Sequence, residues 1–384
     1  MKQGYRKLGD FIRQVDVRNK DLSIDKLLGV SITKSFIPSI ANTVGTDFSN
    51  YKIVRKGQFA YGPVTSRNGE KISIALLRED DCIISSSYSV FEIICSELNA
   101  EYLMLWFMRP EFDRYARYKS HGSVREIFDW EELCSVELPV PNIEKQLEIV
   151  NSYNAIENRI ALKRKINDNL LALAQTYFNN LFTIEGAALP DGWKTAIIGD
   201  YCADNVANLS KADNLETILY LDTGSVTQNY ISSLQELNLT VDVIPSRAKR
   251  KVSDGDIVYS TVRPNLRHYA LIQNPPCNLI ASTGFAVLSN KGLGVSNELI
   301  FMWLTKDSVL EYLQAIAENS VSTYPSLNVS DLLNVEIIVP DDSILRKANR
   351  FLKTIFSVVD DNNNQVTSLL NSQSILLPKL LSSR

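Results

Sequence analysis

Two long stretches of the chain carry apolar residues at helical spacing. The first leads from Ile143 to Leu181 in steps of three or four residues with one wider gap, and the second leads from Ile344 to Leu380. Each pattern predicts a helix of about 40 residues, which would be about 60 Å long at 1.5 Å per residue. A helix of this length with one apolar stripe needs a partner surface.

Two surfaces could cover these stripes. Either each helix packs on its own globular domain, or the two helices pack on each other, which is the arrangement we favour. The first helix leads through a linker with Gly and Pro residues, 183–192, into a second domain, and the second helix starts where that domain ends. Paired helices would therefore run antiparallel, with the globular domains at opposite ends.

The middle of each stripe is polar. Lys163 fills the gap in the first stripe, and Asn362 holds the matching position in the second. In an antiparallel pair these two positions lie close to the symmetry axis, so we expect them to form a polar contact that fixes the register, with Asp360 or Asp361 nearby. Their Cα atoms must then lie within about 15 Å of each other, because neighbouring helix axes are only about 8–10 Å apart.

The chain also resembles itself at a separation of about 198 positions. A strand-like run that stops at a proline precedes each long helix, at 135–141 and at 334–340. Three further matches keep the same order: 56–61 with 254–259, 82–87 with 278–283, and 102–107 with 299–304.

These patterns predict an α+β fold with a pseudo-two-fold internal repeat. It would have two similar domains of mixed strands and helices at opposite ends of an antiparallel pair of long coiled-coil helices. The expected boundaries are 1–141 for the first domain, 142–182 for the first helix, 183–340 for the linker and second domain, and 341–384 for the second helix.

Composition limits the class of protein. The 384 residues are 45% hydrophobic, which is enough for real cores, and the net charge of −4 means that any nucleic-acid surface is local. The five cysteines form no C-x-x-C pair, and neither a signal peptide nor a membrane span is expected from the hydropathy pattern. We therefore expect a cytoplasmic protein.

Catalytic patterns are weak throughout. With only His121 and His268, the sequence has no H-E-x-x-H motif, and it has no G-x-x-x-x-G-K-[ST] phosphate loop. The segment 292–297 lacks the third glycine of a dinucleotide fingerprint. We expect no metal, no cofactor and no catalytic residue in this chain.

The segment 274–277 contains two consecutive prolines. Asn274-Pro275-Pro276-Cys277 is similar to the Asn-Pro-Pro-aromatic loop of adenine-N6 methyltransferases, in which the aromatic ring stacks on a flipped base. Cys277 replaces that ring, and no glycine-rich cofactor loop precedes the segment. Two prolines between strand-like runs are an ordinary turn, and a turn is our interpretation.

Basic and polar residues that could contact nucleic acid cluster in both domains. The second domain contains a basic hexapeptide at 246–251 and a loop at 259–268 with arginines, hydroxyls and an amide, the groups that contact phosphates and base edges. A charge run is more often a solvated face, so this evidence alone leaves both readings open. The first domain has comparable stretches at 61–71 and 117–125, whereas the second domain differs at the position of the latter stretch, which suggests two different targets. The candidate DNA-binding residues are Lys56, Tyr61, Arg67, Lys71, Lys119, His121, Arg125, Arg247, Lys249, Arg250, Lys251, Thr261, Arg263, Asn265, Arg267, His268 and Tyr324.

Taken together, these features resemble the specificity subunits of type I restriction-modification systems. The residues that carry the likeness are 138–141 running into 144–150, then 170–178, 255–264 and 282–287, in an order that covers essentially the whole chain. The resemblance implies two target recognition domains that each read one half of a bipartite site in double-stranded DNA. It also implies two methyltransferase subunits docked mainly on the helical regions, and motor-nuclease subunits that join for cleavage.

The helical regions would then hold partner-binding residues. The candidates are Gln146, Lys163, Gln175, Asn362 and Gln373. The segment 341–347 departs from the family pattern, because it lacks the Glu-Gln pair of the first helix. A coiled-coil adaptor whose two domains bind protein is the alternative, and the net acidity favours it slightly.

Overall fold

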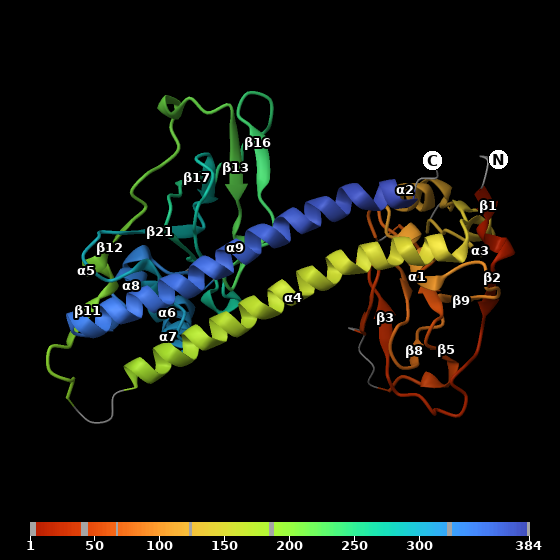
Figure 1. Ribbon diagram of the computed structural model, residues 1–384, viewed down its shortest axis with the longest axis horizontal. Coiled ribbons are helices and arrows are strands. Elements are labelled where there is room, and N and C mark those ends of the chain that lie inside the picture. The colour runs from red at the N-terminus through yellow and green to blue at the C-terminus, as the bar shows by residue number, and fades with distance from the viewer. Residues whose placement is uncertain are drawn as a thin grey trace. The chain divides into compact units, whose positions relative to one another are not determined.

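A computed structural model describes residues 5–39, 45–66, 68–122, 125–183, 188–320 and 325–381 (Figure 1). The chain divides into two compact units. Unit 1 comprises Met1–Ala161 and Ser368–Arg384, and unit 2 comprises Leu162–Thr367. Each long helix therefore contributes one part to each unit.

Unit 1 is built on an antiparallel sheet with the strand order β2-β9-β6-β7. The pairs β1–β10, β3–β4 and β5–β8 are also antiparallel. The strands are β1 (Tyr5–Lys7), β2 (Ile12–Val15), β3 (Leu28–Val30), β4 (Phe36–Pro38), β5 (Lys52–Val54), β6 (Phe59–Tyr61), β7 (Ile74–Leu76), β8 (Cys82–Ile84), β9 (Ser89–Ile93) and β10 (Glu137–Pro139). The helices are α1 (Ala100–Phe107), α2 (Pro110–Lys119), α3 (Trp130–Cys134) and the first part of α4 (Ile143–Phe182).

Unit 2 has two four-stranded sheets, β12-β21-β18-β19 and β16-β13-β20-β17. Only β13 and β20 pair in parallel among the strand pairs of the described residues. The strands are β11 (Lys194–Ile197), β12 (Cys202–Asp204), β13 (Thr217–Leu221), β14 (Val226–Thr227), β15 (Tyr230–Ile231), β16 (Gln235–Asn238), β17 (Ala248–Lys251), β18 (Ile257–Ser260), β19 (Tyr269–Leu271), β20 (Leu279–Ser282), β21 (Phe285–Asn290) and β22 (Glu336–Val339). The helices are α5 (Ile198–Tyr201), α6 (Asn297–Leu304), α7 (Asp307–Glu318), α8 (Val329–Leu333) and the first part of α9 (Asp342–Leu381).

The internal repeat is visible element by element. Strand β6 matches β18, β8 matches β20, α1 matches α6, and β10 matches β22, in the order that the sequence predicts. In both units the strand before the long helix pairs with the first strand of its own repeat, β1–β10 and β11–β22. The predicted α+β fold with two similar domains and two long helices is confirmed.

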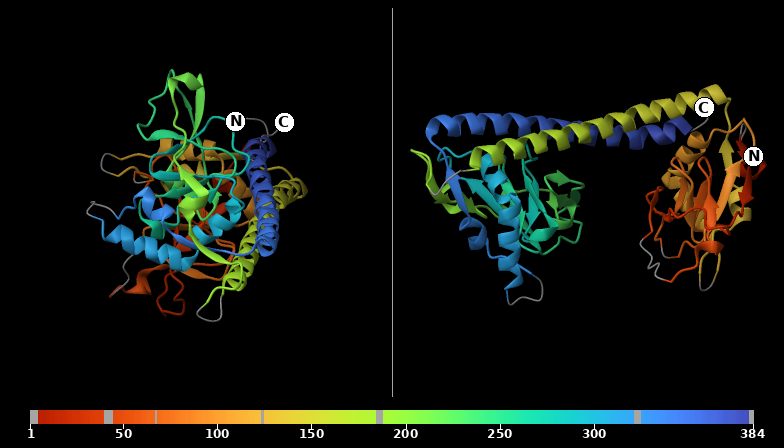
Figure 2. Two further views of the ribbon diagram at one scale, coloured as in Figure 1. Left: turned by 90° about the vertical axis from the view of Figure 1, so that its left-hand side faces the viewer. Right: turned by 90° about the horizontal axis from the view of Figure 1, so that it is seen from below.

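Within unit 2, α4 and α9 lie side by side and antiparallel (Figure 2). Lys163 Nζ donates to Asn362 Oδ1 at 2.9 Å, which confirms the predicted polar contact. Asn167 completes the network: it accepts from Asn362 Nδ2 at 2.8 Å and donates to Asn363 Oδ1 at 2.9 Å. Because Asn362 and Asn167 are buried, these hydrogen bonds fix one alignment of the two helices.

The side chain of Asp360 hydrogen-bonds to residues other than Lys163 and Asn362. Asp360 accepts hydrogen bonds from Asn274 at 3.1 Å and Asn364 at 3.2 Å, so asparagines and not aspartates complete the network. Partial burial raises the pKa of Asp360.

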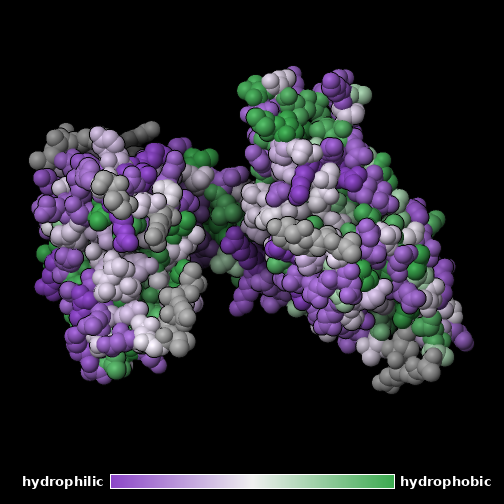
Figure 3. All heavy atoms as spheres, turned by 180° about the vertical axis from the view of Figure 1, so that it is seen from behind, coloured by the Kyte–Doolittle hydropathy of each residue, from purple (hydrophilic) through white to green (hydrophobic). Residues whose placement is uncertain are grey.

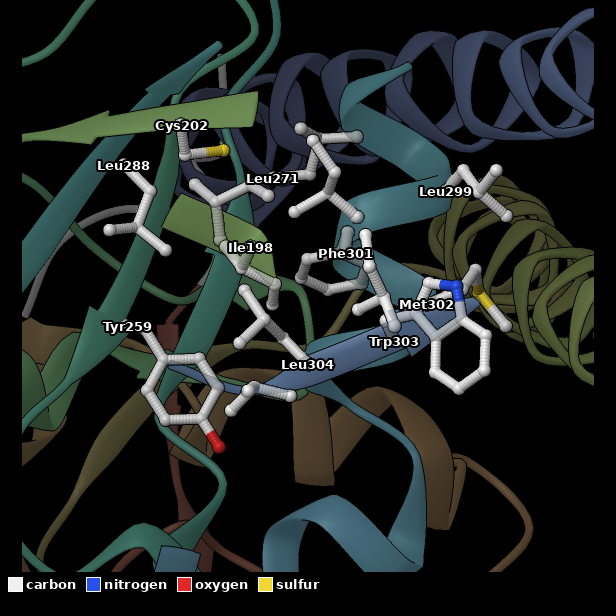
Figure 4. Packing of buried hydrophobic residues seen from close by; sticks show 14 of the residues in the cluster. Ile198, Cys202, Tyr259, Leu271, Leu288, Leu299, Phe301, Met302, Trp303 and Leu304 are labelled. Atoms are coloured by element: carbon white, nitrogen blue, oxygen red, sulfur yellow. The ribbon is translucent and has the colours of Figure 1, made fainter. Parts of the chain in front are cut away.

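The helices also enter the domain cores, so both arrangements that the sequence left open occur. In unit 1, Ile149 and Tyr153 of α4 and Leu377 of α9 belong to one buried cluster. In unit 2, Phe178 and Phe182 of α4 pack on the Trp303 ring with centroids 5.0 and 4.8 Å apart. Figure 4 shows Trp303 beside Met302, with Phe301 and Leu304 nearby.

Gln146 is a correction to the predicted set of partner-binding residues. Its side chain is fully buried. The amide accepts from Asn99 N at 2.8 Å and donates to the carbonyl oxygens of Glu97 and Pro141 at 2.7 and 2.8 Å. The side-chain oxygen and both N–H groups of the Gln146 amide therefore have partners inside unit 1, and these hydrogen bonds anchor the first turn of α4.

The Asn-Pro-Pro-Cys segment is a turn, as predicted. It connects β19 and β20, which lie in different sheets, and Asn274 adopts a left-handed conformation with φ 48°. Asn274 N donates to Asp254 Oδ1 at 2.7 Å and its side chain donates to Asp360 on α9. The segment therefore ties the second domain to the long helix.

Neither long helix is a membrane span. Among the described residues, no helix combines the length and the apolar character that crossing a bilayer requires. The face shown in Figure 3 mixes hydrophilic and hydrophobic residues on both units.

The polar network predicts a specific stability effect. Asn362→Ala leaves Asn167 buried without its donor and Lys163 without its acceptor, so we expect a loss of about 1–3 kcal/mol in unfolding free energy. Asn364→Ala, at an exposed position two residues along α9, is the matched control and should change stability by less than about 0.5 kcal/mol. Urea unfolding followed by circular dichroism measures both, and equal effects of the two variants would contradict the role of the network.

Candidate nucleic-acid interface

The loop between β18 and β19 is strained and tightly held. Arg263 and Arg267 both adopt left-handed conformations, with φ of 50° and 56°, on either side of a short 3-10 turn, Pro264–Leu266. Each such residue costs about 1–3 kcal/mol and persists only where the surroundings fix it. Here Asn265 N donates to Gln314 Oε1 at 3.0 Å, and Arg267 Nη2 lies 2.9 Å from Asp307 Oδ1. Both partners lie on α7, which therefore holds the loop in one shape.

The turn at Thr283 and Gly284 brings two predicted residues together. Thr261 donates to Gly284 O from both its N–H, at 3.0 Å, and its hydroxyl, at 3.2 Å. Thr283 N donates to Arg247 O at 2.8 Å. A Cβ on Gly284 would lie 2.9 Å from Thr223 Cγ2, so the close approach of these loops favours glycine. Thr261 and Arg247 thus lie at one edge of the second domain.

The basic hexapeptide separates into free and paired side chains. Lys251 Nζ lies 2.6 Å from Asp213 Oδ1, and this ammonium holds the pKa of Asp213 below its usual value. Arg250 donates to Asn208 Oδ1 at 3.1 Å and is half-buried. Arg247 and Lys249 are exposed, so they are the members of the hexapeptide best placed to meet phosphates.

His268 has a structural contact. Its Nδ1 lies within hydrogen-bonding distance of Val226 O and 3.4 Å from Thr227 Oγ1. The ring therefore braces β14 against the loop, and it is only partly exposed. Tyr324 lies outside the described residues.

In the first domain, Tyr61 is a second correction. It lies in β6 at 1% exposure, with its ring against Phe91 and Phe128, and burial raises the pKa of its hydroxyl. It cannot contact DNA in this structure, because it faces the core of unit 1. Lys56 and Lys71 are exposed, and Arg67 lies outside the described residues.

The other basic stretch of the first domain is partly neutralised. Lys119 Nζ lies 3.3 Å from Glu132 Oε2, and His121 Nε2 lies 3.7 Å from the other oxygen of the same carboxylate. Arg125 is exposed. The structure thus brings Lys119 and His121 together, but it gives them a shared acidic partner that weakens their attraction for phosphate.

Sequence reasoning missed one buried ion pair that shapes this domain. Lys34 Nζ lies 2.5 Å from Asp113 Oδ1, with side-chain exposures of only 7% and 12%, and Asp113 also accepts from Ile72 N. Burial lowers the pKa of Lys34, and the hydrogen bond to Asp113 opposes this shift. The pair fixes the β3–β4 connection to α2, next to the predicted residue Lys71. No local pattern signals a contact between residues so distant in sequence.

Of the remaining helix candidates, Gln175, Gln373 and Lys163 are half-buried and Asn362 is buried. Gln175 donates to Asn179 within α4 at 3.0 Å, and Gln373 donates to Glu157 within unit 1. Lys163 and Asn362 hydrogen-bond to each other, and Asn362 is only 7% exposed, so Asn362 is a further correction to the predicted partner-binding residues. Metal ligands do not gather anywhere in the described residues, where no group of three or more His, Cys, Asp or Glu side chains could hold an ion.

Comparisons with known proteins agree with this architecture. Residues 10–172 match the family described as "Type I restriction modification DNA specificity domain". The HindI specificity subunit of Haemophilus influenzae is 26% identical over 181 residues, and the MjaIX specificity subunit of Methanocaldococcus jannaschii is 24% identical over 305 residues. The aligned segments cover 46% and 73% of this chain, and 38% and 68% of those two proteins.

The fold has a solved counterpart. The crystal structure of the type I restriction-modification S subunit from M. genitalium superposes with a TM-score of 0.57 at 14% identity, covering 99% of this chain and 96% of that one. This chain and that S subunit therefore share one overall fold. In sequence, residues 10–172 are similar to the DNA specificity domain of type I restriction-modification systems, and the two curated relatives are specificity subunits of such systems.

The contrast between Lys249 and Lys251 gives a test of the interface. On double-stranded DNA, Lys249→Ala should reduce the slope of log K against log salt by about 0.9 for a lost phosphate contact. Lys251→Ala should leave the slope nearly unchanged and lower the thermal stability, because Lys251 is paired with Asp213. Fluorescence anisotropy at several salt concentrations measures the slope, and a larger change for Lys251→Ala would contradict this assignment.

Proposed function

We propose that this chain is the non-catalytic DNA-specificity subunit of a type I restriction-modification complex. Each domain, 1–141 and 183–340, reads one half of a bipartite site in double-stranded DNA. The helical regions 142–182 and 341–384 set the spacer between the half-sites and dock two methyltransferase subunits. Motor-nuclease subunits join this assembly, and the methyl donor and ATP bind to partners, so this chain needs no cofactor.

One observation carries the proposal. Two copies of one α+β framework differ in the loops that hold the candidate contacts, so a shared scaffold presents two different surfaces. In the second domain, Arg263 is exposed on a strained loop that α7 holds in place. Fixed arginine forks can form bidentate hydrogen bonds to guanine in the major groove.

Similarity to known proteins supports the same function. The matched family is described by DNA specificity, and both curated relatives are named as specificity subunits of type I restriction enzymes. The five cysteines are all free thiols, which fits the cytoplasmic location of a DNA-modifying complex.

Methyl transfer in a mixture tests this function. The chain, a cognate methyltransferase subunit and the methyl donor, incubated with random-sequence DNA, should place methyl groups at adenines of one fixed split motif. The chain alone should give no transfer. Methylation without a motif would contradict the proposal and favour the alternative, a coiled-coil adaptor that binds protein.

A single substitution sharpens the assignment. Arg263→Ala should relax one base pair in one half of the motif, at a cost of about 1–3 kcal/mol, and leave the other half unchanged. Asp307→Ala is a companion variant that frees Arg267 and tests whether the loop must be held. A uniform loss across all sequences would assign Arg263 to a phosphate contact instead.

A further inference from the structure

One small hairpin recurs in both domains beside the loop that carries the candidate DNA contacts. In the first domain Leu27 pairs in parallel with Ile83 of β8, and the hairpin β3–β4 follows. In the second domain β13 pairs in parallel with β20, the repeat match of β8, and the hairpin β14–β15 follows. The hairpins therefore hold the same place in the two repeats, but their tips differ, 31–35 in the first and 228–229 in the second.

The second tip is bonded directly to the loop between β18 and β19. Gln228 N donates to Arg267 O at 2.9 Å. Asn229 N donates to Tyr269 O, also at 2.9 Å. The Asn229 side chain accepts from Leu271 N at 2.9 Å, so this amide is used inside the domain. The Gln228 side chain, by contrast, is exposed beside the strained arginine loop.

The backbone conformation makes Gln228 an unusual residue for this turn. Gln228 and Asn229 both have positive φ, 47° and 65°. Two-residue hairpin turns with positive φ favour asparagine and glycine, because most residues with a Cβ are strained there. Asparagine tolerates the conformation better than glutamine, since its short side chain can hydrogen-bond to the local backbone. A strained residue with an exposed side chain indicates a role for that side chain.

The first tip is held through α2 instead. Lys34 has φ of 65°, and its buried ammonium pairs with Asp113, which also accepts from Ile72 N at 3.1 Å. Because Ile72 belongs to the loop between β6 and β7, one carboxylate ties the hairpin tip to that loop. Within the tip, Ser31 Oγ accepts from Thr33 N at 3.0 Å and from the Thr33 hydroxyl at 2.9 Å. The tip is thus fixed, and the Thr33 side chain stays exposed.

The charges around the tips favour nucleic acid as the partner. Thr33 lies in the lining of a cavity of about 330 Å³. This lining has more basic than acidic residues: Lys34, Lys71 and Arg114 against Glu70 and Asp113. A net positive lining favours the DNA backbone over a basic protein surface. The second tip lies against the loop that carries Arg263 and Arg267.

We infer that the two hairpin tips are reading elements that act together with the loops they hold. Resting on the proposed function, Gln228 reads a base of the second half-site and Thr33 reads a base of the first. A glutamine amide can bond both N6 and N7 of adenine, and a threonine methyl can contact the methyl group of thymine. Lys34 and Asp113 are positioning residues, because they fix the first tip and its loop from a buried position.

Base preference tests the second tip. The complex of this chain with a cognate methyltransferase subunit methylates DNA in which the split motif is randomised one position at a time. Gln228→Ala should reduce the preference at one position of one half-site by about tenfold or more, as for the loss of one bidentate contact. Gln235→Ala changes an exposed glutamine on β16 and is the matched control, which should keep every preference.

The first tip is tested by two variants of its own. Thr33→Ala should relax a position of the other half-site. Uracil in place of thymine at that position should weaken methylation by the wild-type complex but not by this variant. Lys34→Met should relax the same position, whereas a purely structural role would lower activity on all sequences equally. Circular dichroism shows whether Lys34→Met folds, and if it does not, Thr33→Ala alone decides.

The outcomes separate this inference from the proposed function. If the wild-type complex methylates a fixed split motif and both Gln228→Ala and Thr33→Ala keep all base preferences, the tips are not reading elements. The same conclusion follows if these variants lose bound subunits without a change in base preference, because the tips would then contact protein. If the wild-type complex shows no motif, the proposed function itself fails.

Discussion

The burial of helix ends in domain cores is the constraint on which this structure depends. The first turn of α4 contains Gln146, whose amide hydrogen-bonds to three backbone groups of unit 1, and its last turns place Phe178 and Phe182 in the core of unit 2. Helix α9 likewise supplies Leu377 to the core of unit 1. Neither domain core is therefore complete within its own repeat, and the long helices cannot separate from the domains without exposing apolar surface.

Periodicity and self-similarity predicted the elements that depend on local pattern. Both 40-residue helices, the repeated strands and the contact between Lys163 and Asn362 follow from spacing alone. Spacing could not show that Asn167 completes the polar network. Matching positions in the two repeats predict that Lys163 and Asn362 meet near the pseudo-two-fold axis. Whether a third residue such as Asn167 joins them depends on its side-chain rotamer, which the spacing does not determine.

The candidate site was harder to predict, because composition does not reveal which charges are already paired. Lys249 and Lys251 are equivalent as residue types, yet only Lys251 has a carboxylate at 2.6 Å. Tyr61 belongs to a sequence that reads equally well as a strand or a loop, and the structure places it in the core. The left-handed Arg263 and Arg267 carry no sequence signal, since glycine is the residue that usually indicates that conformation.

The polar network in the long helices has a consequence for how such a chain could arise and change. Lys163 and Asn362 occupy matching positions of the two repeats, but one is a cation and the other a neutral amide. A protein built from two identical first halves would bring two lysines together at this half-buried position, and like charges so close together oppose association. The two halves have therefore become complementary rather than interchangeable, so exchange of whole halves between related chains must preserve this unlike pair.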